Sequence, residues 1–105
     1  MRPILDSLSD AEVLQELGAR IRAARQARDL TIEQAALKAG VHRNTLSKVE
    51  EGSDTQLSTL IRVLRTFGRL QMLDMFLPAP TVSPMQLARQ QAKQQLRQRV
   101  RPRKR

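Results

Sequence analysis

Apolar residues recur at three- and four-residue steps along most of the chain, which is the period of amphipathic helices that share a core. The first apolar stripe predicts a helix over residues 10–28, and Ser9 followed by Glu12 has the capping-box spacing that opens such a helix. The stripe consists of Leu14, Leu17, Ile21 and Ala24. No alternating pattern indicates a strand, so an all-α chain is expected.

Two shorter helices are predicted next. Thr31 and Gln34 repeat the capping-box spacing and open the second helix, and Gly40 can adopt the positive φ that ends it. The third helix is predicted from His42 to about Glu51. Two short helices joined by about three residues that include a glycine have the form of a helix-turn-helix.

Two further helices are predicted before the chain changes character. The Ser-Asp-Thr cluster at 53–55 is suited to capping a fourth helix, whose apolar face ends at Phe67. A fifth helix over residues 70–77 precedes the Pro-Ala-Pro break at 78–80. We therefore expect a five-helix bundle followed by a linker and a tail.

Charge divides the chain at the same place. Residues 1–77 carry eleven Lys or Arg and ten Asp or Glu, whereas residues 78–105 carry eight Lys or Arg and no acid. Nearly all of the formal charge of +9 therefore lies in the last quarter of the chain. We predict a helix-turn-helix domain over residues 10–77 and a basic, Pro-containing tail over residues 78–105 that is attracted to a polyanion.

The tail is rich in good helix formers, and Ser83-Pro84 has the form of an N-cap before the first helical residue. Its apolar positions form one narrow stripe, Met85, Ala88, Ala92 and Leu96. Such a segment is expected to be disordered or partly helical until it meets a partner. DNA phosphate and a protein with an acidic groove both fit, and a tail that only keeps the protein soluble is the third interpretation.

Several function classes are disfavoured by composition. The chain has no cysteine and a single histidine, His42, which removes disulfides and the usual zinc sites. It also lacks a phosphate-cradling glycine loop and a cluster of paired carboxylates. We expect no enzyme, no cofactor and no metal. Without a long apolar run or a signal-peptide pattern, a cytoplasmic protein that does not enter membranes is expected.

The predicted third helix has two chemically different faces. Leu46 and Val49 face inward, whereas Arg43, Asn44 and Lys48 lie on the polar outward face, together with Ser47 and Glu51. Arginine can bind guanine O6 and N7, asparagine can pair with adenine, and Lys48 can reach a guanine edge or a phosphate. An ordinary solvated helix carries the same residue types, so this chemistry alone leaves both interpretations open.

Residues 17–77 resemble the phage-repressor helix-turn-helix family, also called Cro/CI or XRE. The resemblance is carried by Leu30-Thr31, Ala36, Gly40 and the segment Leu46-Ser47-Lys48-Val49-Glu50-Glu51-Gly52. It implies a bundle of four or five helices in which Arg43, Asn44 and Lys48 read bases. His42 and Thr45 then correspond to positions near the DNA backbone, and Ser47 is predicted there as well.

The resemblance also implies a structural pair, and it has one departure. Family members commonly pair an Arg of the first helix with a Glu at the end of the recognition helix, here Arg25 and Glu50; two solvated surface charges are the alternative. Where many relatives place a phosphate-binding Gln, this chain has Ile32, which has no side-chain donor. Backbone N–H groups, with Gln34 or Arg20, would then contact the DNA backbone.

Partners follow from the same resemblance. Proteins of this type bind paired half-sites as twofold dimers. We predict a homodimer face at Met72, Met75, Phe76 and Leu77, with closure of the monomer's own core as the alternative. The bundle, the Pro-containing break and the basic tail are similar to HipB-type antitoxins. This implies double-stranded DNA and a HipA-like kinase toxin as partners, whereas an adaptor that neutralises a partner without reading DNA is the other interpretation.

Overall fold

Helices make up the regular structure of the residues that this computed structural model describes, 1–80 and 84–100, and no strand occurs among them. In chain order the elements are α1 (Asp10–Ala27), α2 (Ile32–Ala39), α3 (Arg43–Glu50), α4 (Leu57–Thr66), the 3-10 helix η1 (Leu70–Met72), α5 (Leu73–Phe76) and α6 (Pro84–Val100). The all-α prediction is confirmed. The predicted cap Ser83 lies outside the described residues.

Local hydrogen bonds explain where α1 and α2 begin. At α1, the Glu12 N–H donates to the Ser9 hydroxyl at 3.2 Å and the Ser9 N–H donates to the Glu12 carboxylate at 3.0 Å. Thr31 and Gln34 form the same reciprocal pair at α2, at 3.1 and 2.9 Å. Both predicted capping boxes are therefore present, and each satisfies two backbone donors at a helix start.

The turn between α2 and α3 is short because Gly40 takes a φ of 69°. The Val41 N–H then donates back to the Ala36 carbonyl at 3.0 Å, which closes the end of α2. His42 is the N-cap of α3, which starts at Arg43. The turn of the predicted helix-turn-helix and the helix ends beside it are thus set by local hydrogen bonds.

The predicted cap of α4 by the polar cluster at 53–55 is wrong. This helix begins at Leu57, after Gln56, and no side chain caps it. The Ser53 N–H instead donates to the Lys48 carbonyl at 2.9 Å, so it belongs to the C-terminal motif of α3, in which Gly52 has a φ of 93°. The predicted fifth helix is also divided, into η1 and the four-residue α5.

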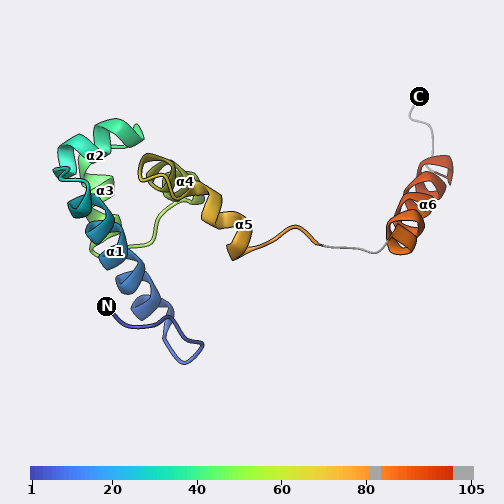
Figure 1. Ribbon diagram of the computed structural model, residues 1–105, viewed down its shortest axis with the longest axis horizontal. Helices are drawn as coiled ribbons and strands as arrows, with labels where there is room; N and C mark the ends of the chain where they lie inside the picture. Colours follow the sequence, from blue (N-terminus) through green and yellow to red (C-terminus); the bar gives the residue numbers. More distant parts are fainter. Residues whose placement is uncertain (81–83, 101–105) are drawn as a thin grey trace.

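The core lies where α2 packs against both α3 and α4, and α3 packs against α1 (Figure 1). The buried apolar side chains are Ile21, Ala35, Ala36, Leu46, Val49, Val63 and Phe67. Leu17, which was predicted to share the buried stripe of α1, remains 38% exposed. The inward side chains of α3 therefore fix this helix on the bundle and leave its other face free.

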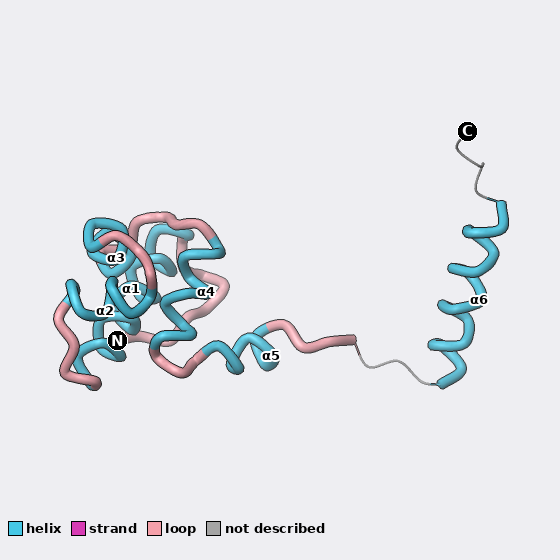
Figure 2. The backbone as a smooth tube through the Cα atoms, turned by 90° about the horizontal axis from the view of Figure 1, so that it is seen from above, coloured by secondary structure: helices cyan, strands magenta, loops and turns pink. Residues whose placement is uncertain are grey.

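The last helices extend away from this bundle. Figures 1 and 2 show α5 leading outward and α6 standing apart from the bundle. The radius of gyration of 20.1 Å exceeds the value of about 13 Å that a compact chain of this length would have. None of the helices in the described ranges combines the length and the apolar character needed to cross a bilayer.

Candidate nucleic-acid interface

The outward face of α3 brings together the three residues that were predicted to read bases. Arg43, Asn44 and Lys48 are all exposed, whereas Leu46 on the opposite side is buried. Thr45, a predicted backbone contact, is half-buried, and so is Ser47. The arrangement gives a helix with donors and acceptors outward and its apolar side fixed on the core, which is the form a groove-binding helix requires.

His42 organises the first turn of this helix. Its Nδ1 atom accepts a hydrogen bond from the Asn44 N–H at 3.1 Å, so the imidazole acts as the N-cap of α3. With Nδ1 occupied as an acceptor, the exposed ring keeps Nε2 as its donor. The predicted role of His42 at the DNA backbone is compatible with this geometry, because a donor at a helix start suits a phosphate oxygen.

Arg43 has a partner in the free protein. Its Nε atom lies 3.1 Å from a carboxylate oxygen of Glu33 in the first turn of α2, and both side chains are more than half exposed. The pair joins the two helices of the motif on their solvent side. In the free protein Arg43 is therefore held by Glu33 at the Nε side of its guanidinium.

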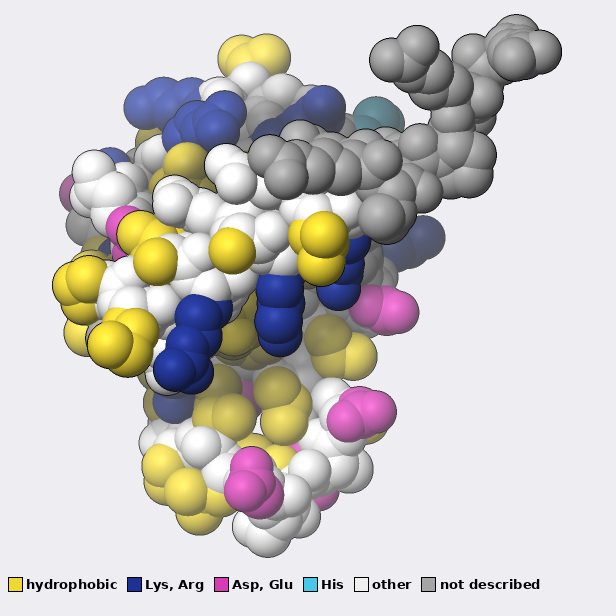
Figure 3. Space-filling view, turned by 90° about the vertical axis from the view of Figure 1, so that its right-hand side faces the viewer, with side chains coloured by type: hydrophobic (Ala, Val, Ile, Leu, Met, Phe, Trp, Pro, Cys, Tyr) yellow, Lys and Arg dark blue, Asp and Glu magenta, His cyan; other side chains and the backbone are white. Residues whose placement is uncertain are grey.

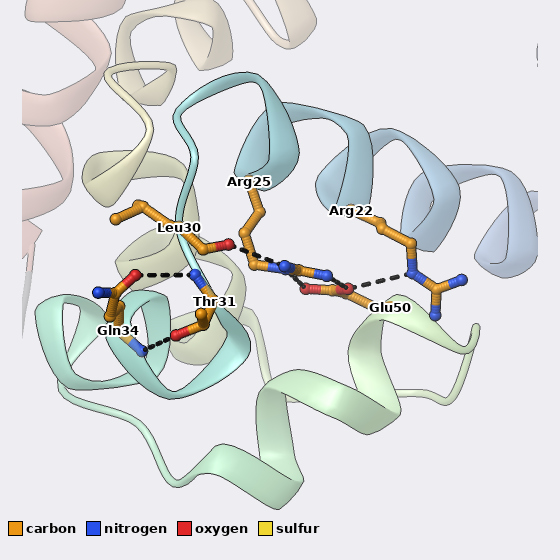
Figure 4. A network of polar contacts seen from close by, with 6 residues as sticks. All are labelled: Arg22, Arg25, Leu30, Thr31, Gln34 and Glu50. Atoms are coloured by element: carbon orange, nitrogen blue, oxygen red, sulfur yellow. Dashed lines mark hydrogen bonds and ion pairs between the residues drawn. The ribbon is translucent and has the colours of Figure 1, made fainter.

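Glu50 forms the most deeply buried ion pair of the described residues. Its side chain is fully covered, and Arg25 holds both carboxylate oxygens, with Nε at 2.7 Å from Oε2 and Nη2 at 2.9 Å from Oε1 (Figure 4). Arg25 also donates from Nη1 to the Leu30 carbonyl at 2.8 Å. The hydrogen bond with Glu50 raises the pKa of Arg25. This guanidinium therefore links α1, the loop before α2 and the end of α3.

Two residues of this junction were not predicted. Arg22 donates from Nε to Oε1 of Glu50 at 3.2 Å, as a second cation on the carboxylate. At Gly18, an added Cβ would lie 2.5 Å from the Glu50 carbonyl oxygen and 2.6 Å from that of Val49. The backbones of α1 and α3 thus touch at Gly18. The sequence contained a signal for both residues: Gly18 lies on the same face of α1 as Ile21, and Arg22 lies three residues before Arg25.

The structure does not bring Arg20 to this surface. Arg20 is two residues from Gly18 and so points to the opposite side of α1. It donates to the Glu16 carboxylate at 3.1 Å and to the Arg2 carbonyl at 3.0 Å. Burial raises the pKa of Glu16, but hydrogen bonds from the Arg2 N–H and from Arg20 outweigh it, so the net pKa lies below its usual value. Arg20 secures the segment before α1.

Gln34 keeps only part of its side chain for a ligand. The carboxamide oxygen accepts from the Thr31 N–H, while the amide NH₂ remains at the exposed start of α2.

The predicted dimer face is exposed. Its residues Met72, Met75, Phe76 and Leu77 are between 54% and 81% exposed, so they do not close the core of one chain. In the described ranges, no group of three or more His, Cys, Asp or Glu is placed to hold a metal ion.

In a comparison with models of known protein families, residues 21–72 match the family described as helix-turn-helix. The match runs from the second half of α1 to the end of η1 and includes the whole of α2, α3 and α4. A search of curated proteins found no significant match to the chain.

Proposed function

Because the chain belongs, through residues 21–72, to the XRE/Cro-CI type of helix-turn-helix family, we propose that it is a sequence-specific repressor. Members of this family are DNA-binding regulators and not catalysts. In the same proposal the protein binds paired half-sites as a homodimer. In this proposal residues 10–77 form the DNA-binding domain and residues 78–105 form a linker and basic tail. Arg43, Asn44 and Lys48 contact bases, while His42, Thr45, Ser47 and Gln34 contact the backbone.

The outward face of α3 is the observation that carries this proposal. Its exposed side chains include an arginine and an asparagine in the first turn, where recognition helices contact bases. The buried Arg25–Glu50 pair fixes the other end of α3 against α1. A helix held rigidly at one end presents its first turn in a defined direction, which favours specific contacts over random ones.

The exposed apolar residues of α5 support the homodimer. Met75 and Phe76 are 81% and 78% exposed on a helix that extends away from the bundle (Figure 2). Large apolar side chains grouped on a surface mark an interaction site, and a second copy of α5 covers them symmetrically.

A second part of the proposal concerns the tail. The helix α6 stands apart from the bundle and carries Arg and Lys side chains gathered along its length (Figure 3), without any acidic residue. An unpartnered basic helix of this kind supports a role in binding a second macromolecule. We propose that the protein is the antitoxin of a HipA-like kinase, represses its own operon and acts in the cytoplasm.

Selection of bound fragments from genomic DNA tests the repressor proposal. Purified protein and the Arg43→Ala/Asn44→Ala variant are compared at one stated salt concentration, each with and without the product of the neighbouring gene. We expect the wild type to enrich one symmetric motif. The variant should lose about 1–3 kcal/mol per base contact and its preference for that motif.

The control separates DNA reading from other functions. Lys93→Ala on α6 removes a charge away from α3 and should leave the motif unchanged. An adaptor that does not read DNA would be indifferent to the Arg43→Ala/Asn44→Ala change. Enrichment of no motif by the wild type would exclude sequence-specific repression. The neighbouring gene product should change the affinity if it is the partner, and an unchanged affinity counts against the antitoxin part alone.

A further inference from the structure

The surface between α2 and α4 carries basic side chains that form no ion pair with any carboxylate of the described residues. The ion pairs of the described residues involve Glu12, Glu16, Glu33 and Glu50, and their cations lie on α1, at Arg2 and at Arg43. Lys38, Arg62 and Arg65 form no ion pair within the part of the chain that the structure describes. Residues 55–73 contain three arginines and no acid. A local excess of positive charge attracts anions.

These three cations line an open hollow of about 570 Å³, which Ala39, Gly40 and Thr66 complete. Arg62 donates from Nη1 to the Gly40 carbonyl at 3.3 Å, which holds one edge of the guanidinium at the turn and leaves the other edge free. A Cβ placed on Gly40 would meet no atom within 4 Å. The hollow is therefore open to solvent above the turn.

The hollow adjoins the start of the recognition helix. Gly40 lies three residues before Arg43, and three Cα–Cα steps of 3.8 Å span at most about 11 Å. The major groove is about 12 Å wide, so the Gly40 edge of the hollow lies within one groove width of the first turn of α3. A duplex whose groove holds that turn brings its phosphates close to the hollow.

We propose that Lys38, Arg62 and Arg65 form a binding site for DNA backbone phosphates that flank the base pairs contacted by α3. The inference rests on the proposed function and extends it to a surface outside the helix-turn-helix. Guanidinium groups bind phosphate through two parallel N–H donors, and an ammonium adds a point charge. Phosphate contacts set register and affinity without choosing bases. The site supplies a phosphate anchor that Ile32 cannot provide.

The test uses the full chain and the selected duplex. Lys38→Gln/Arg62→Gln/Arg65→Gln is compared with the wild type over a range of salt concentrations. Each phosphate contact makes the fall of log affinity with log salt steeper by about 0.9. Between 1 M and 0.1 M salt, one such contact therefore raises the affinity by about eightfold. We expect the variant to lower the slope by roughly two to three, with the base preference intact.

Single methylphosphonates, which remove one phosphate charge at a time, locate the effect. Positions beside the half-site should weaken wild-type binding and should have no further effect on the triple variant, because the two changes remove the same contact. The matched control, Arg89→Gln/Lys93→Gln/Arg97→Gln on α6, removes the same charge and should keep the full methylphosphonate effect at those positions.

Two results would overturn the site. One is a triple variant whose affinity has the same salt dependence as that of the wild type. The other is a triple variant that loses further affinity when the flanking phosphates are replaced by methylphosphonates. If thermal melting shows the triple variant unfolded, Lys38→Gln/Arg65→Gln replaces it, because this pair leaves the Arg62–Gly40 hydrogen bond in place. A wild type without base preference would refute the proposed function instead, and the slope comparison on that DNA still decides the phosphate site.

Discussion

Arg43, the residue that the sequence favours for contacting guanine, is bound to a carboxylate in the free protein. Its ion pair with Glu33 spans 3.1 Å between two exposed side chains. Double-mutant cycles give exposed pairs of this kind about 0.2–1 kcal/mol. Glu33 also lies in the first turn of α2, which belongs to the proposed DNA-facing side. In the proposed complex, Glu33 would therefore compete with DNA for Arg43 and repel phosphate as well.

Glu33→Gln should bind the selected duplex more tightly than the wild type does. Releasing Arg43 accounts for a gain of up to about fivefold, since about 0.2–1 kcal/mol is no longer needed to break the pair. Fluorescence anisotropy at fixed salt measures the change. In an Arg43→Ala background the part of the gain that comes from Arg43 should vanish. Weaker binding by Glu33→Gln would show that the ion pair positions Arg43 productively.

Arg25 and Arg22 share the Glu50 carboxylate but differ in burial. The Arg25 side chain is 11% exposed and that of Arg22 is 48% exposed. Arg25→Gln should lower the free energy of unfolding by about 3 kcal/mol, because it leaves a buried carboxylate with one exposed partner. Arg22→Gln should cost less than about 1 kcal/mol. Urea denaturation measures both, and equal losses would contradict this division of roles.

At the scale of elements, the position of α3 depends on its contact with α1 at Gly18. Alanine normally stabilises a helix relative to glycine by about 1 kcal/mol. Here the added methyl group would lie within 2.6 Å of two carbonyl oxygens of α3, which is too close for any relaxed packing. Steric crowding should therefore outweigh helix propensity.

Gly18→Ala is expected to destabilise the protein by about 1–3 kcal/mol, the usual cost of overpacking. It should also weaken DNA binding, because α3 must shift away from α1. Thermal melting followed by circular dichroism measures the first effect and anisotropy the second. Ala19→Gly, the reverse exchange at the neighbouring half-buried position, tests propensity without the clash and should cost at least about 1 kcal/mol. A stabilised Gly18→Ala variant would refute the close approach.

Element boundaries that depend on local hydrogen bonds were predicted from the sequence. The capping boxes at Ser9 and Thr31 and the positive φ of Gly40 involve neighbours only. The start of α4 was not predicted, because Ser53 is already used by the end of α3.

The contacts between elements were harder to predict. The Arg25–Glu50 pair came from the family resemblance, whereas the second arginine at Glu50 and the contact at Gly18 depend on how α1 lies against α3. Arg20 was placed at DNA because the buried carboxylate of Glu16, one turn away, could not be foreseen from composition. Periodicity identifies a helix face, but only tertiary packing decides which neighbour that face meets.

At the scale of the whole molecule, the chain leaves several large apolar side chains of α5 and its C-terminal end outside the bundle. Phe76 and Leu77 are each 78% exposed, and α5 contacts only η1 closely. Full burial of such a side chain is worth about 1.5–3 kcal/mol, and a twofold interface counts every residue twice. Four such side chains contribute about 6–12 kcal/mol, which is comparable with the cost of association, about 4–15 kcal/mol, so their removal should shift the balance between dimer and monomer.

Met75→Ser/Phe76→Ser should convert a homodimer into a monomer while the bundle stays folded, because neither side chain packs in the core of its own chain. Sedimentation velocity at micromolar concentration measures the first effect and thermal melting the second. Leu37→Ser, at an equally exposed leucine of α2, is the matched control and should remain dimeric. On a duplex with two half-sites, the double variant should lose cooperative binding and occupy each half-site independently. A wild type that sediments as a monomer would mean that paired half-sites are not read through this face. A double variant that unfolds would mean that α5 stabilises its own chain.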